Sequence, residues 1–255
     1  SRGEHVEALQ RSLNETGLVD LEVDGIFGPQ THGAVRLVQS HLDMPPTGEV
    51  DHGLRAALRV WDIVPPKIHD TDLRSAAYRL RVDYPAIAAI VAVESRGDGF
   101  LHSGRPTILF ERHIMRRRLI HLGLRPEGPI DIVNVEPGGY KGGEREWARF
   151  ERAAEISWDA AVESCSWGLF QVMGFHWSRL GYMSPRGWYE KMSTSEAEHL
   201  EAFIRYVEAD DLLLQALKDH RWAAVARRYN GPAYAKNRYD KRLQAEYEAI
   251  AGVSR

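Results

Sequence analysis

Glu94 is the residue whose place in the sequence best suits acid catalysis. It follows the apolar stretch 85–93, which opens with a proline, and Gly97 comes three residues later. Proline suits the first turn of a helix and glycine suits the position just past its end, so the stretch predicts a helix ending between them. On such a helix Glu94 shares one face with three aliphatic residues, Ile87, Ile90 and Val91.

This expected environment favours the protonated form of Glu94. An aliphatic face removes water from the carboxylate, which raises its pKa. The negative end of the helix dipole disfavours the carboxylate further. An acid that keeps its proton near neutral pH can protonate the departing oxygen of a glycosidic bond. The sequence therefore predicts Glu94 as a general acid. The alternative is a structural carboxylate at a helix end, bonded to Arg96 or Arg105.

The tripeptide Val-Glu-Ser occurs twice, and its second copy contains Glu163. The predicted helix 158–165 carries an apolar stripe formed by Trp158, Ala161, Val162 and Cys165. Glu163 lies off that stripe, so we expect it to face solvent. A buried acid is costly without a purpose or a partner, which favours Glu94 over Glu163 as the functional residue.

A second catalytic group is harder to identify. Two carboxylates lie about 5–5.5 Å apart in retaining glycosidases and about 6.5–9.5 Å apart in inverting ones. The candidates are Glu111, Asp98 and Asp131. Glu111 follows an apolar run and is expected to point inward, where it could equally pair with an arginine and stabilise the fold. A second acid is unnecessary if a sugar hydroxyl attacks in place of water, and the sequence leaves both outcomes open.

Several residues could hold a sugar polymer. Gly168 permits close approach of a ligand to the backbone, and Gln171 can both donate to and accept from sugar hydroxyl or acetamido groups. Trp167, Phe170 and Trp177 offer flat faces for sugar rings, although core packing is the simpler interpretation of their neighbours Leu169 and Met173. Tyr229 could reach the same cleft from the segment 228–234, where Asn230-Gly231 on its own indicates a turn.

The first sixty residues predict a small helical unit. One helix carries Val6, Leu9, Gln10 and Leu13 on one face, a second spans 29–41, a third spans 51–60, and residues 64–71 form a linker. The spacing of Val6-x-x-Leu9-Gln10-x-x-Leu13-Asn14, Val23-Asp24-Gly25-Ile26-Phe27-Gly28, Thr31-x-x-Ala34-Val35-x-x-Val38-Gln39 and Gly48-x-Val50-Asp51 resembles the three-helix peptidoglycan-binding domain. The resemblance implies binding to the peptide stem or glycan of cell-wall material.

The remainder is predicted to be mainly α, with at most a small β element. Helices are expected over 72–82, 85–94, 111–121, 144–154, 158–165, 195–217, 222–228 and 240–251. Residues 106–110 form a short apolar run that could be a strand. Residues 122–143 contain six glycines and three prolines, too many for regular structure, and a loop of this length is usually a binding loop or disordered.

Four motifs in this region carry a second resemblance. They are Ala92-Val93-Glu94-Ser95-x-Gly97-x-Gly99-Phe100, Gly104-Arg105-Pro106-x-Ile108-Leu109-Phe110-Glu111-Arg112-His113, Pro137-Gly138-Gly139-Tyr140 and Ser166-Trp167-Gly168-Leu169-Phe170-Gln171-x-Met173-Gly174. With Tyr229-Asn230-Gly231 they resemble the lysozyme-like superfamily, and more closely the N-acetylmuramidase domain of modular phage endolysins.

This second resemblance implies hydrolysis of the β-1,4 bond between N-acetylmuramic acid and N-acetylglucosamine. It adds Ser166, Tyr140 and Asn230 to Trp167, Gln171 and Tyr229 as candidate substrate contacts. The expected organisation is a peptidoglycan-binding domain over 1–63, a linker over 64–71 and a lysozyme-like catalytic domain over 72–255.

Composition limits the possible partners. The net charge of −3 argues against a nucleic-acid binder, and no apolar run approaches the roughly 18–20 residues needed to span a bilayer. The basic cluster Arg112, Arg116, Arg117 and Arg118 is expected to be a solvated helix face. No secretory signal is visible at the start. We expect a monomer without cofactor or metal and without stable membrane insertion, made in a host cytoplasm and acting in the periplasm after membrane permeabilisation.

Four alternatives remain. A lytic transglycosylase would leave 1,6-anhydromuramic acid ends. A cysteine peptidase could use Cys165 with His220 and Asn230, although Cys165 lies on an apolar stripe where a thiol is usually inert. A zinc amidase lacks support because no His-Glu-x-x-His pattern is present. A wall-binding structural protein of a phage would not cleave the wall at all.

Overall fold

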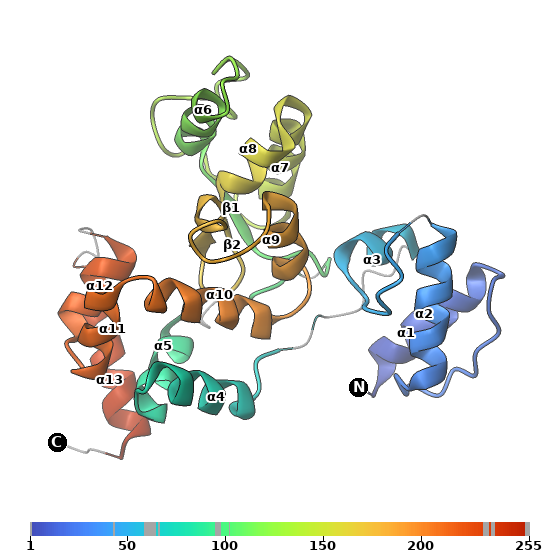
Figure 1. The fold of residues 1–255 in the computed structure, drawn as a ribbon, viewed down its shortest axis with the longest axis horizontal. Coiled ribbons are helices and arrows are strands. Elements are labelled where there is room, and N and C mark those ends of the chain that lie inside the picture. Colours follow the sequence, from blue (N-terminus) through green and yellow to red (C-terminus); the bar gives the residue numbers. More distant parts are fainter. Residues whose placement is uncertain are drawn as a thin grey trace. The chain divides into compact units, whose positions relative to one another are not determined.

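Helices account for most of the regular structure in every part of the chain (Figure 1). The computed structural model describes residues 2–42, 44–58, 65, 67–94, 98–101, 103–231, 235 and 238–252. Within these residues there are thirteen α-helices and one three-stranded sheet, so the predicted mainly α fold is confirmed. The chain divides into two units, Ser1–Pro66 with Phe100–Pro106, and Lys67–Gly99 with Thr107–Arg255.

The smaller unit contains the three predicted helices, α1 (Glu4–Glu15), α2 (Pro29–His41) and α3 (His52–Leu58). The predicted face of α1 is buried. The core is formed by aliphatic side chains from all three helices, Leu9, Leu13, Ala34, Val35, Val38, Leu54 and Leu58. Burial of this apolar surface is what holds three short helices together, because helices of this length are marginal alone.

Two buried glutamines fix the loops of the smaller unit. Gln10 donates to the Asp24 carboxylate at 2.7 Å and accepts from the Gly25 amide at 3.0 Å. Gln39 accepts from the Gly48 amide at 2.8 Å. Gly25 and Gly48 both have positive φ angles, 67° and 79°, which residues other than glycine rarely adopt. The glycines therefore allow the turns, and the glutamine amides satisfy their buried backbone groups.

The larger unit follows the predicted order of elements closely. Its helices are α4 (Asp70–Leu80), α5 (Tyr84–Glu94), α6 (Arg112–His121), α7 (Glu144–Ile156), α8 (Trp158–Glu163), α9 (Pro185–Met192), α10 (Glu196–Glu208), α11 (Asp211–Lys218), α12 (Trp222–Asn230) and α13 (Tyr239–Ile250), with a short 3-10 turn, Gly174–His176. Helix α9 was not predicted. The predicted helix 195–217 is two helices, because Asp210 caps the start of α11 by accepting from the Leu213 amide.

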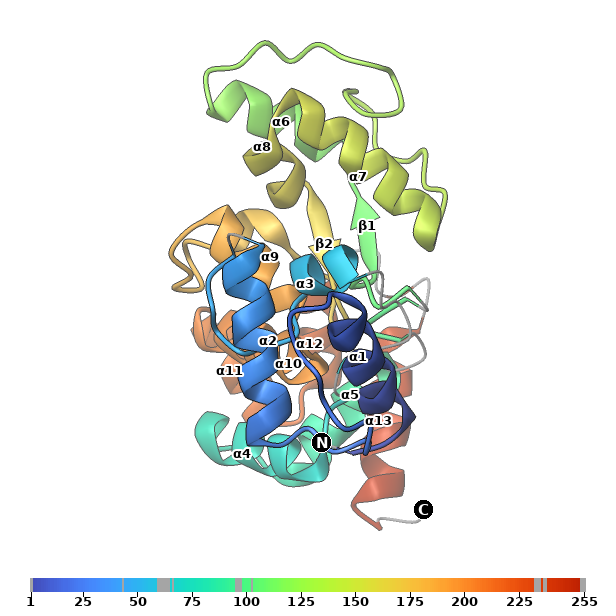
Figure 2. The ribbon, with the colours of Figure 1, turned by 90° about the vertical axis from the view of Figure 1, so that its right-hand side faces the viewer.

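The sheet is antiparallel and consists of β1 (Ile108–Phe110), β2 (Cys165–Trp167) and β3 (Val172–Met173). Ile108 pairs with Trp167, and Trp167 pairs with Val172. The prediction that the helix continues to Cys165 is wrong, because Cys165 opens β2. Within this unit, α6, α7 and α8 lie beyond one end of the sheet, and α4, α5 and α10–α13 lie beyond the other (Figures 1 and 2).

The loop 122–143 has no helix or strand, as predicted, yet several hydrogen bonds fix its backbone. The Arg112 guanidinium donates to the carbonyls of Ile130, Glu136 and Pro137 at 3.3, 2.8 and 3.0 Å. Arg118 donates to Glu163 at 2.6 Å. The prediction that the arginine cluster is a solvated face is therefore wrong for Arg112 and Arg118.

Parts of the predicted linker 64–71 are placed by the structure. Residues 64 and 66 lie outside the described residues, and α4 already begins at Asp70. No helix in the described ranges combines the length and the apolarity that crossing a bilayer requires.

Candidate active site

Glu94 is the last residue of α5. Pro85 lies in the first turn, as predicted, and Ile87 and Ile90 are buried. The predicted glycine stop at Gly97, together with Ser95 and Arg96, lies outside the described residues. The structure thus confirms the helix that carries Glu94 and leaves the carboxyl half-buried at its end.

The hydroxyl of Tyr239 donates a hydrogen bond to Glu94 Oε1. Tyr239 is the first residue of α13, which packs along α5. One turn later, Arg242 donates to the Val93 carbonyl at 2.9 Å. These bonds fix the end of α5 against the start of α13. Tyr239 also has a hydrogen bond with the Asn230 side chain.

Burial raises the pKa of Glu94 above its ordinary value, and the Tyr239 hydrogen bond and the Arg242 charge offset this only in part. The Arg242 guanidinium acts on Glu94 through space, since its hydrogen bond goes to the backbone carbonyl of Val93. The physical cause is therefore the one that the sequence predicted, loss of water from the carboxylate. A raised pKa is what a proton donor needs near neutral pH.

Tyr229 and Asn230 end α12 close to this acid. The Tyr229 hydroxyl donates to the Phe170 carbonyl, and its ring meets Phe203 edge-on at 5.3 Å. Burial first, and then the charge of Glu94, raise the pKa of Tyr229 well above its usual range. Asn230 is exposed. The structure thus brings Glu94, Tyr229 and Asn230 together; Tyr234 lies outside the described residues.

Strand β2 and the turn that follows it hold two further predicted residues, Ser166 and Gln171. Ser166 Oγ donates to Gln171 Oε1 at 2.7 Å, and Gln171 Nε2 donates to the Gly168 carbonyl at 2.8 Å. Gln171 is exposed and has a φ of 50°, which is uncommon for a residue with a side chain. These two bonds hold its amide in one orientation at the tip of the turn.

His199 explains why position 168 is a glycine. A Cβ atom there would lie 2.5 Å from the His199 ring. His199 Nδ1 accepts from the Leu169 amide at 3.1 Å, and Nε2 lies 2.8 Å from the Met192 carbonyl. Burial lowers the pKa of His199 to about 4. The ring is therefore neutral near pH 7, with its proton on Nε2, and it supports the turn from beneath.

Asp98 lies in the segment that follows the Glu94 helix. Its carboxylate is exposed and forms an ion pair with Lys67 at 2.6 Å. The adjacent Gly99 amide donates to the buried Glu196 at 3.1 Å. Asp98 and Leu169 also line a groove of about 350 Å³ that reaches α5. The buried start of α10 thus anchors both this segment and the turn at Gly168.

Glu111 and Tyr140 meet each other. The Tyr140 hydroxyl lies 2.9 Å from both carboxylate oxygens of Glu111, and His113 Nδ1 lies 3.2 Å from one of them. Glu111 immediately precedes α6, and Tyr140 lies near the end of the long loop. In the described residues, no hydrogen bond or ion pair links this pair to Glu94. Asp131, the third acid considered, is paired with Arg152 at 2.6 Å.

Trp167 and Glu163 lie in places that their patterns did not indicate. Trp167 is 1% exposed, donates to the Val162 carbonyl at 3.0 Å and packs edge-on against Tyr189 at 5.7 Å. Its ring therefore has no open face for a sugar. Glu163 is 3% exposed, so the prediction that it faces solvent is wrong. The Arg118 guanidinium donates to the Glu163 carboxylate at 2.6 Å and neutralises its charge. The Trp177 indole donates to the other carboxylate oxygen at 2.7 Å.

The residues considered for a cysteine peptidase or a metal site do not form one in the described part of the structure. Cys165 is fully buried, and burial raises the pKa of its thiol well above the ordinary value, so a thiolate nucleophile is disfavoured. His220 pairs with Asp83 at 2.9 Å rather than with Cys165. Within the described ranges no group of three or more His, Cys, Asp or Glu is placed to hold a metal ion.

The partners of Glu94 are the residues that sequence reasoning missed. Tyr239 and Arg242 lie about 145 residues further along the chain, and no local motif connects them to Glu94. A signal did exist. Tyr239 directly precedes the predicted final helix 240–251 and lies four residues before Leu243, and both prove to be buried in α13.

Comparison with known proteins identifies the family of this chain. Residues 83–251 match the family described as N-acetylmuramidase, and residues 2–58 match the putative peptidoglycan binding domain. No curated protein matches. The crystal structure of Burkholderia AP3 phage endolysin is similar, with 43% sequence identity and a TM-score of 0.71 over 98% of this chain and 95% of that chain. Because the first match spans well over half of the residues, the chain belongs to the N-acetylmuramidase family.

Proposed function

We propose that this muramidase is an endolysin in which Glu94 is the general acid. It cleaves the β-1,4 bond between N-acetylmuramic acid and N-acetylglucosamine and so lyses the host cell wall. The observation that carries the assignment is the half-buried carboxyl with a raised pKa, bonded to a neutral phenol. Membership of the N-acetylmuramidase family and the likeness to a phage endolysin support it.

Proton transfer would begin from the protonated Glu94 and end on the glycosidic oxygen. The carboxylate left behind accepts the Tyr239 hydrogen bond and lies in the field of Arg242. Both groups favour the charged form, so they lower the free energy of the acid after it has lost its proton. A positioned general acid of this kind typically contributes about 10²–10⁴ in rate.

For the second group we propose Glu111, with Tyr140 holding its carboxylate. Two oxygens within 2.9 Å of one hydroxyl fix the direction in which the carboxylate can accept a proton from water. Asp98 is the alternative, and its exposed pairing with Lys67 gives it less positional constraint. Ser166, Gln171, Tyr140, Tyr229 and Asn230 are the proposed substrate contacts; the buried Trp167 would support the turn behind them.

The smaller unit is proposed to hold the enzyme on the wall. We assign residues 1–63 to peptidoglycan binding, 64–71 to a linker and 72–255 to catalysis. The protein would act as a monomer without nucleic acid, cofactor or stable membrane insertion. It would be made in the host cytoplasm and reach the periplasmic wall after the inner membrane is permeabilised.

The test is the variant Glu94→Gln assayed on purified cell walls. Turbidity should fall at least about 10²-fold more slowly, because the general acid is lost, while sedimentation with the wall stays at the wild-type level. Glu111→Gln should lose about 10²-fold if Glu111 activates the attacking water. Near-normal lysis by a folded Glu94→Gln protein would falsify the assignment. Mass spectra should show muropeptides ending in reducing muramic acid; 1,6-anhydro ends would identify a transglycosylase instead.

A further inference from the structure

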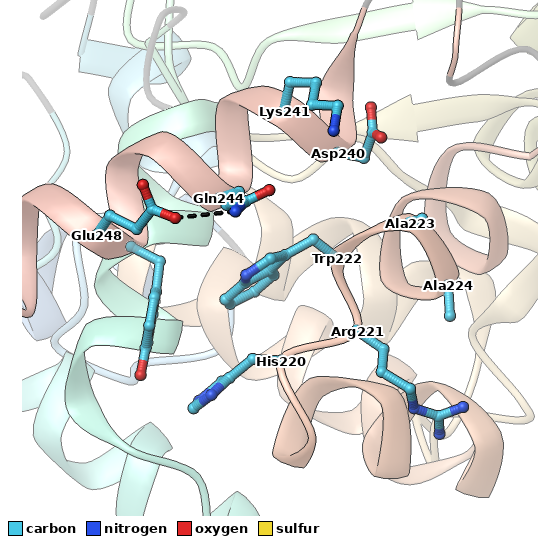
Figure 3. A pocket seen from close by; sticks show the side chains of 10 residues that line it. His220, Arg221, Trp222, Ala223, Ala224, Asp240, Lys241, Gln244 and Glu248 are labelled. Atoms are coloured by element: carbon cyan, nitrogen blue, oxygen red, sulfur yellow. Dashed lines mark hydrogen bonds between the residues drawn. The ribbon is translucent and has the colours of Figure 1, made fainter. Parts of the chain in front are cut away.

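A groove of about 630 Å³ lies between α13 and the turn that leads into α12 (Figure 3). Trp222, Tyr247 and Gln244 line it together with charged side chains from both elements. Pockets that hold small ligands commonly have volumes of about 300–1,000 Å³. None of the roles assigned above uses these side chains.

The groove lies on a different flank of α13 from the Glu94 site. Tyr239 and Arg242 bond to the end of α5, and the buried Leu243 shares their side. Asp240, Gln244 and Glu248 recur every four residues on the groove side. At about 100° per residue these two sets point in clearly different directions from the helix axis. A ligand in the groove would therefore not occupy the position of the scissile bond.

The aromatic wall of the groove is held rigidly. The rings of His220 and Trp222 are stacked with centroids 5.6 Å apart, and the Tyr247 ring lies 4.4 Å from His220 and 5.2 Å from Trp222. Asp83 anchors two of the three rings, pairing with His220 Nε2 at 2.9 Å and accepting from the Tyr247 hydroxyl at 2.8 Å. Binding to a wall that is already ordered costs little conformational entropy.

The polar lining is balanced in charge. The groove is lined by Arg221 from the turn before α12 and by Asp240, Lys241 and Glu248 from α13, so two cations and two anions cancel. Gln244 Nε2 donates to Glu248 at 2.8 Å, which orients the amide and leaves its carbonyl oxygen able to accept. This lining suits a ligand without net charge that has a flat apolar face and many hydroxyl and amide groups.

We propose that the groove is an accessory binding site for an uncharged N-acetylated saccharide strand. Such a sugar has an apolar ring face for Tyr247 and for the part of Trp222 that is exposed, 8% of that residue, and acetamido and hydroxyl groups for Gln244 and its neighbours. The choice of sugar rests on the proposed function, since peptidoglycan is a polymer of N-acetylated sugars. The site holds the catalytic unit on its polymer without taking part in the cleavage.

The test uses the full chain with Glu94→Gln, so that the probe is not cleaved. N,N′,N″-triacetylchitotriose is titrated while the indole N–H resonance of Trp222, assigned by triple-resonance experiments and by its loss in Trp222→Phe, is followed by NMR. The resonance should shift to saturation in the millimolar range. Gln244→Ala should weaken this binding by about tenfold, the effect of losing one good hydrogen bond.

Gln215→Ala is the matched control. Gln215 is a helical glutamine that donates to an acid four residues later at 2.8 Å, as Gln244 does, but it lies outside the groove. It should leave the titration unchanged. A resonance that does not move, or that moves equally in Gln244→Ala, overturns the proposal. A shift caused by a soluble stem peptide and not by chitotriose also overturns it. Because binding is read without cleavage, these results are independent of whether Glu94 is the acid.

Discussion

Two carboxyls of the larger unit, the half-buried Glu94 and the buried Glu146, have opposite electrostatic surroundings. Glu146 is 0% exposed, and burial alone would raise its pKa. The amides of Lys141, Gly142 and Phe110 donate to it, and the Arg149 guanidinium adds a bond at 2.8 Å. Together these groups bring the pKa of Glu146 below its ordinary value.

Glu94 has far fewer groups that stabilise its charged form. A single hydroxyl donates to it among the described residues, and the guanidinium of Arg242 acts only through space. The comparison shows that burial by itself does not identify a proton donor. What matters is whether donors and cations compensate the buried charge. Glu146 is compensated and holds the loop 141–142 against β1. Glu94 is under-compensated, which raises its pKa and favours the protonated form.

The largest expected effect on stability separates these two acids. Glu146→Gln leaves the Arg149 guanidinium, 3% exposed, without its counter-charge, which should cost about 3–5 kcal/mol of unfolding free energy. Glu94→Gln removes a group that folding desolvates without full compensation, so it should cost less than about 1 kcal/mol. Urea denaturation followed by circular dichroism measures both. Equal losses in the two variants would mean that the two sites do not differ in how their buried charge is compensated.

The next effect concerns His199, which supports the turn beside the Glu94 site. Its pKa is lowered to about 4 in the folded state from the ordinary value of 6.5, so the unfolded chain binds the proton more strongly. The contribution of His199 to the free energy of unfolding is therefore fully present above about pH 6.5. It is lost as the pH drops towards 4, by on the order of 3 kcal/mol.

Replacing His199 by asparagine should flatten this dependence. The measurement is the unfolding free energy at pH 7 and at pH 4.5 in both proteins. His176, whose pKa burial also lowers to about 4, contributes a separate part of the slope and remains in the variant. An unchanged slope in His199→Asn would show that protonation of this ring does not limit stability. Low pH thus favours the protonated form of Glu94, but it also destabilises the turn at Gly168 by protonating His199. This loss of stability sets a lower pH limit for activity.

The sequence predicted local structure well, because local structure follows from spacing within one segment. The face of α1 and the placement of Glu94 on a helix end both depend on residues within two turns. The bounds of α2 were also correct, since Pro29 suits a first turn.

Long-range partners could not be predicted in this way. Tyr239 reaches Glu94 across 145 residues, and Arg118 reaches Glu163 across 45. Glu163 looked solvent-facing because it lies off the apolar stripe of its own helix, and only the packing of α6 on α8 supplies its arginine. Trp167 looked like a sugar platform for a related reason. An aromatic side chain suits a cleft or a core equally well, and the pairing of its strand decides between them.

A smaller effect is expected from Tyr239→Phe. The lost hydrogen bond favours the carboxylate, so its removal should raise the pKa of Glu94 further and move the basic limb of kcat/KM to higher pH. The maximal rate should fall severalfold, since the phenol no longer stabilises the carboxylate formed by proton transfer. Tyr229→Phe is the control, because its hydroxyl donates to the Phe170 carbonyl and not to Glu94. A basic limb that stays in place in Tyr239→Phe, or moves equally in Tyr229→Phe, would contradict this role.

The smallest effect is expected from Asp98→Asn. Its ion pair with Lys67 joins side chains that are 72% and 58% exposed, and exposed pairs contribute at most about 1 kcal/mol to stability. If Glu111 is the second catalytic group, the rate on purified walls should change by less than about twofold. If Asp98 activates the attacking water instead, the rate should fall by about 10² or more while stability stays the same. Lys67→Met provides the control, because it breaks the same ion pair and keeps the carboxylate. A large loss in Asp98→Asn together with a small one in Lys67→Met would transfer the role of base from Glu111 to Asp98.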